Sequence, residues 1–282
     1  MAGLVFFSHL ACADPLNRIQ NCVLVPTDWA DGDSFLVRTP EGDEHTVRLY
    51  GADCIEWHVT DESDARRLRE QRRYFGITQT GGSPQESIKV AKEFGAAAAK
   101  EARRILQEPF TLYSAFSDAR GDGKYKRIYG FVVTQGGVDL SEYLVTAGLA
   151  RAYGVSRETY NARTRDEYRA QLQDLELIAA RSGKGVWSET IWENLSSERQ
   201  EQRIEDREIS MATGGAPLLD GELLNPNEAA RDELMRLPGI GETLANRIIE
   251  GRPYEGIDDL TRVSGIGDST LTKIREFLKI NP

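Results

Sequence analysis

A ten-residue segment occurs twice near the C-terminus, and this repeat limits how the last part of the chain can fold. Residues 232–241 and 258–267 align without gaps at a constant spacing of 26 positions. Each copy has a Gly-Ile-Gly turn between two short stretches with helical periodicity. A single helical pair buries little apolar surface, so the two copies are expected to pack together. The sequence therefore predicts a small all-α domain over residues 223–282.

An acidic segment precedes this domain and indicates a domain boundary. Residues 188–222 hold 9 acidic and 3 basic residues and include the Gly-Gly-Ala-Pro run that ends at Pro217. We interpret residues 189–222 as a solvated helix followed by a flexible linker. The N-terminal 187 residues hold 26 acidic and 24 basic residues. The overall charge of −10 is therefore concentrated outside the N-terminal region, and it does not exclude a nucleic-acid partner.

The region before the acidic segment combines short strands with helices. Strands are predicted at residues 34–38, 45–50, 110–116 and 128–134, with a hairpin turn at 39–43. Helices are predicted at 86–106, from Asp139 to Val145, and from about Asn161 to Arg181. Strands in sequence with helices packed at their ends predict an α+β fold, a small β-barrel with helical caps.

The N-terminal segment, residues 1–21, allows two interpretations. Residues 2–13 are apolar but too short to span a bilayer, so no membrane span is expected. The run Ala11-Cys12-Ala13 has the small residues of a signal-peptide cleavage site, although no Lys or Arg precedes it. The alternative is a buried strand, and the composition slightly favours export. Three scattered cysteines are too few for a disulfide framework or a zinc site.

Two motifs supply the groups that phosphodiester hydrolysis requires. Asp31-Gly-Asp-Ser34 can project carboxylates from a tight turn, and Arg48-Leu-Tyr-Gly-Ala-Asp-Cys-Ile-Glu56 follows soon after. Strict strand alternation would send Arg48 and Asp53 to opposite faces, but Gly51 permits a bend that brings them together. Carboxylates can bind a hard cation, and arginines can bind the phosphoryl oxygens.

Together with Gly123-Lys-Tyr-Lys-Arg127, these motifs resemble the staphylococcal nuclease family over roughly residues 22–188. The resemblance implies an OB-like five-stranded barrel and a calcium-dependent nuclease acting on DNA, RNA or both. It assigns the calcium ion to Asp33, Asp53 and the carbonyl of Cys54, where the family usually has threonine. It assigns phosphate binding in the transition state to Arg48 and Arg127, the general base to Glu56, and substrate contacts to Lys124 and Tyr125.

The segment at 59–85 departs from this family pattern. It contains five arginines, followed by Tyr74 and Phe75. These residues could bind backbone phosphates and stack on a base. The alternative is a solvated helix stabilised by pairs such as Glu62 with Arg66, and Arg-rich surface helices are common enough to favour it.

The repeat at the C-terminus resembles the tandem helix-hairpin-helix units of DNA-uptake receptors and repair proteins. Backbone N–H groups after the glycines can bind a phosphate without reading base sequence. Glu242 and Asp268 weaken this interpretation because they directly follow the turns. A docking site for protein, or a purely structural role, is the alternative. The candidate DNA-binding residues are Gly239, Gly241, Arg247, Gly265, Gly267 and Lys273.

Three functions follow from these patterns. The first is an active nuclease, expected to be monomeric, whose C-terminal domain assists DNA binding. The second is a catalytically silent scaffold that binds nucleic acid or protein, and the third is a small-ligand-binding barrel. A silent copy has no need of Arg48, Glu56 and Arg127 beside both aspartates, so the residues favour the nuclease.

Overall fold

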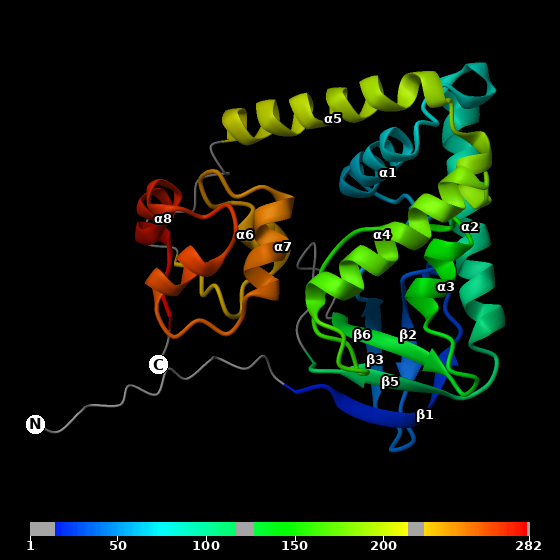
Figure 1. The fold of residues 1–282 in the computed structure, drawn as a ribbon, viewed down its shortest axis with the longest axis horizontal. Coiled ribbons are helices and arrows are strands. Elements are labelled where there is room, and N and C mark those ends of the chain that lie inside the picture. The colour runs from blue at the N-terminus through cyan, green and yellow to red at the C-terminus, as the bar shows by residue number, and fades with distance from the viewer. Residues whose placement is uncertain (1–14, 117–126, 214–222, 281–282) are drawn as a thin grey trace, which may run out of the picture.

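The computed structural model describes residues 15–116, 127–213 and 223–280. A β-barrel with helices packed at one end forms the N-terminal body, and a small helical module lies beside it (Figure 1). The long helix α5 (Trp192–Thr213) extends from the body towards the module. In the described residues no helix is both long enough and apolar enough to cross a membrane.

Five strands close the barrel in the order β1-β2-β3-β6-β5. The β3–β6 pair is parallel and the other pairs are antiparallel. The predicted strands and the α+β class are confirmed. The strands are β1 (Asn17–Val25), β2 (Ser34–Arg38), β3 (Glu44–Leu49), β5 (Phe110–Ser114) and β6 (Arg127–Thr134).

Strand β1 lies partly inside the expected N-terminal segment 1–21. It pairs with β5 from Asn17 and with β2 from Val23. Only Cys22 of this strand is fully buried. The strand therefore lacks the alternation of apolar and polar residues by which a half-buried strand is recognised in a sequence.

Helices cap the barrel, and local side chains fix where they begin. Ser83 caps the helix that Pro84 opens, Asp139 accepts the N–H groups of the next short helix, and Thr164 forms a capping box with Glu167. The last cap explains why that helix begins four residues later than predicted. The elements are α2 (Pro84–Ile105), α3 (Leu140–Thr146), α4 (Arg165–Arg181), the short helices η1 (Thr80–Gly82) and η2 (Gly185–Glu189), and a two-stranded sheet of β4 (Ala52–Cys54) and β7 (Ala150–Ala152).

Helix α1 (Glu62–Phe75) lies in the Arg-rich insertion, and it packs on the body. Leu68 and Phe75 are buried, and the Phe75 ring meets the Trp187 ring edge to face at 4.9 Å. The interpretation as a solvated helix is therefore wrong. Stacking of a base on Phe75 is also excluded, because this side chain is fully buried.

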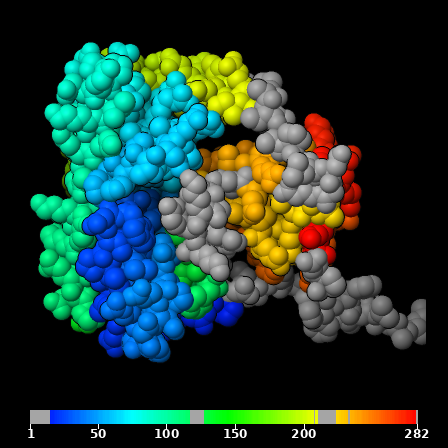
Figure 2. Space-filling model, turned by 180° about the vertical axis from the view of Figure 1, so that it is seen from behind, coloured from blue at the N-terminus to red at the C-terminus, as the bar shows by residue number. Residues whose placement is uncertain are grey.

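The C-terminal module contains the two predicted hairpins. Gly239 and Gly265 have positive φ angles of 79° and 98°, while Gly241 and Gly267 are the N-caps of the second helices. A left-handed residue at each turn explains the glycine requirement. The elements are α6 (Arg231–Leu234), α7 (Glu242–Glu250), η3 (Ile257–Arg262), α8 (Asp268–Ile274) and η4 (Arg275–Phe277). Seen from behind, the module packs beside the body, with α5 above both (Figure 2).

Candidate active site

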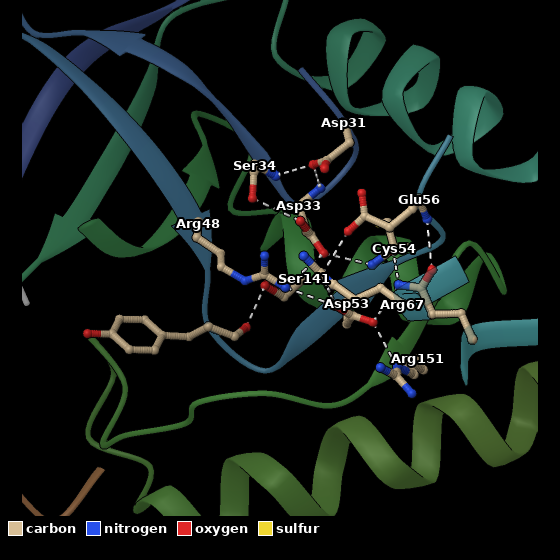
Figure 3. A network of polar contacts seen from close by, with 12 residues as sticks. Asp31, Asp33, Ser34, Arg48, Asp53, Cys54, Glu56, Arg67, Ser141 and Arg151 are labelled. Atoms are coloured by element: carbon tan, nitrogen blue, oxygen red, sulfur yellow. Dashed lines mark hydrogen bonds and ion pairs between the residues drawn. The ribbon is translucent and has the colours of Figure 1, made fainter. Parts of the chain in front are cut away.

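The turn between β1 and β2 places Asp33 in a buried pocket. One carboxylate oxygen of Asp31 accepts the N–H groups of Asp33 and Ser34, at 3.1 and 2.6 Å. Asp31 thus shapes the turn, while Asp33 points inward (Figure 3). A Cβ atom on Gly32 would lie 2.6 Å from the Cys54 sulfur, so glycine lets the turn approach β4 closely. Burial, and then the charge of Asp33, raise the pKa of Asp31 well above its usual value.

A bend at Gly51 brings Arg48 to Asp53, as predicted. Gly51 has a φ of +72° and separates β3 from β4. A guanidinium nitrogen of Arg48 lies 2.9 Å from one carboxylate oxygen of Asp53 and 3.7 Å from one of Asp33. The two motifs recognised in the sequence therefore meet in one pocket (Figure 3).

Asp53 is the centre of the polar network and is almost fully buried. Its Oδ1 atom accepts hydrogen bonds from Arg48 and Arg67, at 2.9 and 3.0 Å. Its Oδ2 atom accepts from Arg151 at 2.8 Å and from the amide of Gln71 at 2.9 Å. Although burial alone would raise the pKa of Asp53, the three guanidinium groups hold it well below its usual range.

Glu56 lies at the other end of the same network. Its carboxylate is 2.8 Å from Arg67, and its backbone N–H donates to Gln71 Oε1 at 2.8 Å. Burial raises the pKa of Glu56, Arg67 opposes this change, and the nearby carboxylates of Asp33 and Asp53 add to it. A buried carboxylate with a raised pKa binds a proton more readily than an exposed one does.

Three residues of this network were not expected from the sequence: Arg67, Gln71 and Arg151. Arg67 and Gln71 are four residues apart on α1 and therefore share one helix face. Since α1 has several arginines, its sequence gives no sign of which one faces the pocket. Arg151 stands between two alanines of β7, and its guanidinium lies 4.0 Å from the centre of the Tyr153 ring. An arginine between two alanines in an otherwise apolar run is a sequence signal that could have identified it.

Three predicted residues of this site remain: Arg127, the first residue of β6, and Lys124 and Tyr125, which precede that strand. Arg127 opens β6 in register with Thr46, and Tyr129 is in register with Arg48. Alternation places Arg127 on the same face of the barrel as Arg48, one strand away. Lys124 and Tyr125 lie outside the described residues.

The expected calcium ligands are already engaged by hydrogen-bond donors. Asp33 accepts the Ser34 hydroxyl at 3.0 Å and the Cys54 N–H at 2.7 Å, and the Cys54 carbonyl accepts from Gln71 at 2.7 Å. In the described part of the chain no group of three or more His, Cys, Asp or Glu side chains is placed to hold a metal ion. The three expected ligands therefore do not fit a calcium ion while these donors are in place.

Three of the four hairpin glycines in the module face open space, whereas a Cβ atom at Gly265 would lie 2.8 Å from a Leu244 methyl carbon. Cβ atoms added at Gly239, Gly241 and Gly267 would meet nothing within 4 Å. Lys273 is exposed on α8. Arg247 donates to the Ser264 carbonyl at 2.8 Å, and it therefore links the two hairpins.

Glu242 has a role that the sequence did not indicate. Its carboxylate pairs with Arg231 at 2.9 Å within the module. Although burial would raise the pKa of Glu242, Arg231, Arg151 and Arg67 lower it. The acidic residue after the first turn is thus balanced by arginines, two of which belong to the Asp53 network.

Helix α7 also fastens the module to the body. The Glu250 side chain is 1% exposed and accepts the Ser156 N–H at 3.0 Å and Arg169 at 2.6 Å. Arg165 and Arg169 of α4 and Arg247 of α7 line a cavity of about 290 Å³ beside this contact. The two parts of the chain are therefore joined by more than their linker.

Comparison with known proteins identifies both parts of the chain. The family model described as staphylococcal nuclease homologue matches residues 46–189, and the helix-hairpin-helix motif model matches residues 220–279. ComE operon protein 1 of Bacillus subtilis (strain 168) is 34% identical over 83 residues, which are 27% of this chain and 40% of that protein. Endonuclease/exonuclease/phosphatase family domain-containing protein 1 of Homo sapiens is 40% identical over 62 residues, or 21% of this chain and 11% of that protein. The chain thus spans less than half the length of these relatives.

Proposed function

Because the chain belongs to the family of staphylococcal nuclease homologues, we propose that it is a nuclease that hydrolyses phosphodiester bonds of DNA, RNA or both. The proposal rests on one observation: Arg48, Asp33, Asp53 and Glu56 converge in a single buried pocket. A small-ligand barrel would not require several guanidinium groups around two aspartates. Little sequence specificity is expected, because guanidinium groups recognise phosphate rather than bases.

Arg48 and Arg127 are the proposed phosphate-binding residues. Guanidinium groups donate paired, charge-assisted hydrogen bonds to phosphoryl oxygens, and these bonds strengthen as negative charge develops on phosphorus. Asp53 and Asp33 hold Arg48 in place before the substrate arrives. Such preorganisation means that little rearrangement is needed at the moment of reaction.

Glu56 is the proposed general base that accepts a proton from the attacking water. Its raised pKa suits this role, because a base is most effective when its pKa approaches the working pH. Arg67 now pairs with Glu56. An incoming phosphate would compete for Arg67 and leave the Glu56 carboxylate available to water.

Calcium is the cation that the family resemblance implies for Asp33, Asp53 and the Cys54 carbonyl, and calcium dependence is part of the proposal. The roles assigned above to Arg48, Arg127 and Glu56 are those of the side chains themselves, and a bound cation would add positive charge beside the phosphate. The helix-hairpin-helix module is proposed to assist DNA binding through the N–H groups after its glycines and through Arg247 and Lys273. Its contacts would be with the backbone, independent of base sequence.

Cleavage of labelled DNA and RNA, in calcium, in magnesium or in chelator, tests the proposal. We expect Arg48→Ala to lower the rate about 100- to 1,000-fold, because one charge-stabilising contact in the transition state is lost. Glu56→Gln should lower it about 100- to 10,000-fold. Arg38→Ala is the matched control, since Arg38 pairs with Glu44 on an exposed part of the barrel.

Two results would decide against the nuclease. Rates unaffected by both Arg48→Ala and Glu56→Gln would remove this pocket from the chemistry. Binding of nucleic acid with no cleavage in any of the three solutions would favour the alternative, a catalytically silent scaffold. Full activity in chelator would contradict only the calcium dependence.

A further inference from the structure

The orientation of the Gln71 side chain is fixed by its neighbours. Its Oε1 atom accepts the Glu56 N–H at 2.8 Å, so the opposite end of the amide must be the NH₂ group. That group donates to Asp53 Oδ2 at 2.9 Å and to the Cys54 carbonyl at 2.7 Å. Gln71 is completely buried. One amide nitrogen thus binds both the Asp53 carboxylate and the Cys54 carbonyl, which are two of the three ligands that the family resemblance assigns to calcium.

The remaining capacity of Asp53 can be counted. A carboxylate has about four lone-pair positions for hydrogen bonds or cations. Arg48 and Arg67 occupy Oδ1, while Arg151 and Gln71 occupy Oδ2. A calcium ion can therefore bind Asp53 only if one of these four donors leaves.

The charges of the ion-paired groups also favour the departure of a donor when calcium binds. Six ion-paired side chains form a group beside Asp31: the carboxylates of Asp33, Asp53 and Glu56 face the guanidinium groups of Arg48, Arg67 and Arg151, three charges against three. A divalent cation would bring the group to a net charge of +2. Departure of Arg67 would offset half of that excess in a buried site, where unbalanced charge is costly.

Among the three arginines that donate to Asp53, Arg67 of α1 can leave most readily, because its side chain is 19% exposed, against 10% for Arg48 and 8% for Arg151. The first turns of α1 are largely exposed, whereas its last residues are fixed by Arg72 to Ser87 and by Phe75 in the core. Arg48 and Arg151 lie on the strands β3 and β7, within the body. Release of the completely buried Gln71 amide means giving up its hydrogen bonds to Asp53 and to the Cys54 carbonyl.

We propose that Gln71 and Arg67 of α1 are internal competitors for the cation and thereby set the calcium affinity of this site. The inference rests on the proposed function only in taking calcium as the cation. It adds that the insertion regulates the site: calcium binding and the release of these two side chains are a single equilibrium.

Calorimetric titration of the full-length protein with calcium chloride alone, without nucleic acid, tests this inference. Gln71→Glu keeps the side-chain length, removes a donor and adds a carboxylate, and it should tighten calcium binding at least about tenfold. Gln71→Ala should tighten it less, because water must complete the shell. Gln79→Glu, on an exposed residue outside the pocket, adds the same charge and should leave the affinity unchanged.

Circular dichroism and thermal melting establish whether each variant is folded. Should Gln71→Glu fail to fold, Arg67→Gln is the second test. Arg67 is only partly buried, and its loss frees one of the two occupied positions on Asp53 Oδ1, where Arg48 remains. Folded variants that bind calcium no more tightly than the parent would overturn the inference. Micromolar calcium binding by the parent would overturn it too, because the ligands would then be available despite their donors. Tighter binding without any cleavage would retain this inference and reject the nuclease.

Discussion

At the scale of single residues, the pocket depends on Asp53, which balances three buried arginines. We expect Asp53→Asn to lower the free energy of unfolding by about 3–5 kcal/mol at pH 7, since it leaves buried charges without a partner. The folded-state pKa of Asp53 lies below its unfolded value of about 3.9, so its stabilisation is present above that value and is lost as the pH falls further. Urea unfolding at pH 7 and pH 3 should therefore show a smaller difference from the parent at pH 3.

The control for this experiment is Asp174→Asn, on the exposed side of α4. It should have little effect at either pH. If Asp53→Asn lowers the free energy of unfolding by the same amount at pH 7 and at pH 3, the ionised carboxylate does not supply the stability.

The same residues show how far the site could be predicted from the sequence. Asp33, Arg48, Asp53 and Glu56 lie in two short motifs, and Gly51 indicated the bend between Arg48 and Asp53. Gln71 and Arg67 could not be predicted, because their positions depend on how α1 packs against residues far away in the sequence. Periodicity identifies the face of a helix, but it does not identify the partner.

At the scale of secondary-structure elements, α3 begins at a buried carboxylate. Asp139 accepts the N–H groups of Ser141 and Glu142, at 2.9 and 3.2 Å. Burial nevertheless raises its pKa to about 7. Since the unfolded value is about 3.9, the folded protein binds the proton more tightly, and stability falls as the pH rises from about 4 to 7.

Asp139→Asn should therefore become more stable than the parent as the pH rises. Asparagine caps a helix as well as aspartate does and has no charge to bury. The difference in unfolding free energy should grow between pH 4 and 7, by up to about 4 kcal/mol, and then stay constant. Melting temperatures at pH 4, 5.5, 7 and 8 measure this trend. A variant with a constant offset at all four values would contradict it.

Elements with clear local signals were predicted well, and elements defined by distant partners were not. The Asp139 cap of α3 and the glycine turns of the module are local features that were recognised in the sequence. The capping box of α4 is also local, but it was not recognised, and the start of α4 was therefore predicted four residues too early. Strand β1 is recognised only through its pairing with β2 and β5. The packing of α1 on the body likewise depends on Trp187, more than a hundred residues away in the sequence.

At the scale of the whole molecule, the sequence predicted two parts joined by a flexible linker, and the structure adds a contact between them. Buried apolar residues of the barrel and of the module belong to one continuous cluster. Glu250 contributes the polar part of this contact through the Ser156 N–H and Arg169. Docking would hold both candidate nucleic-acid-binding parts in one orientation and raise their effective concentration for one strand.

Glu250→Ala should release the module, because it removes a buried carboxylate and leaves the Ser156 N–H and Arg169 without that partner. A loss of about 1–3 kcal/mol in docking free energy is expected. Small-angle X-ray scattering should then report a larger radius of gyration than for the parent, and limited proteolysis should separate the two parts faster. Glu255→Ala, on an exposed residue of the same module, should change neither measurement. Identical scattering curves for Glu250→Ala and the parent would mean that the apolar cluster alone is sufficient to hold the module in place.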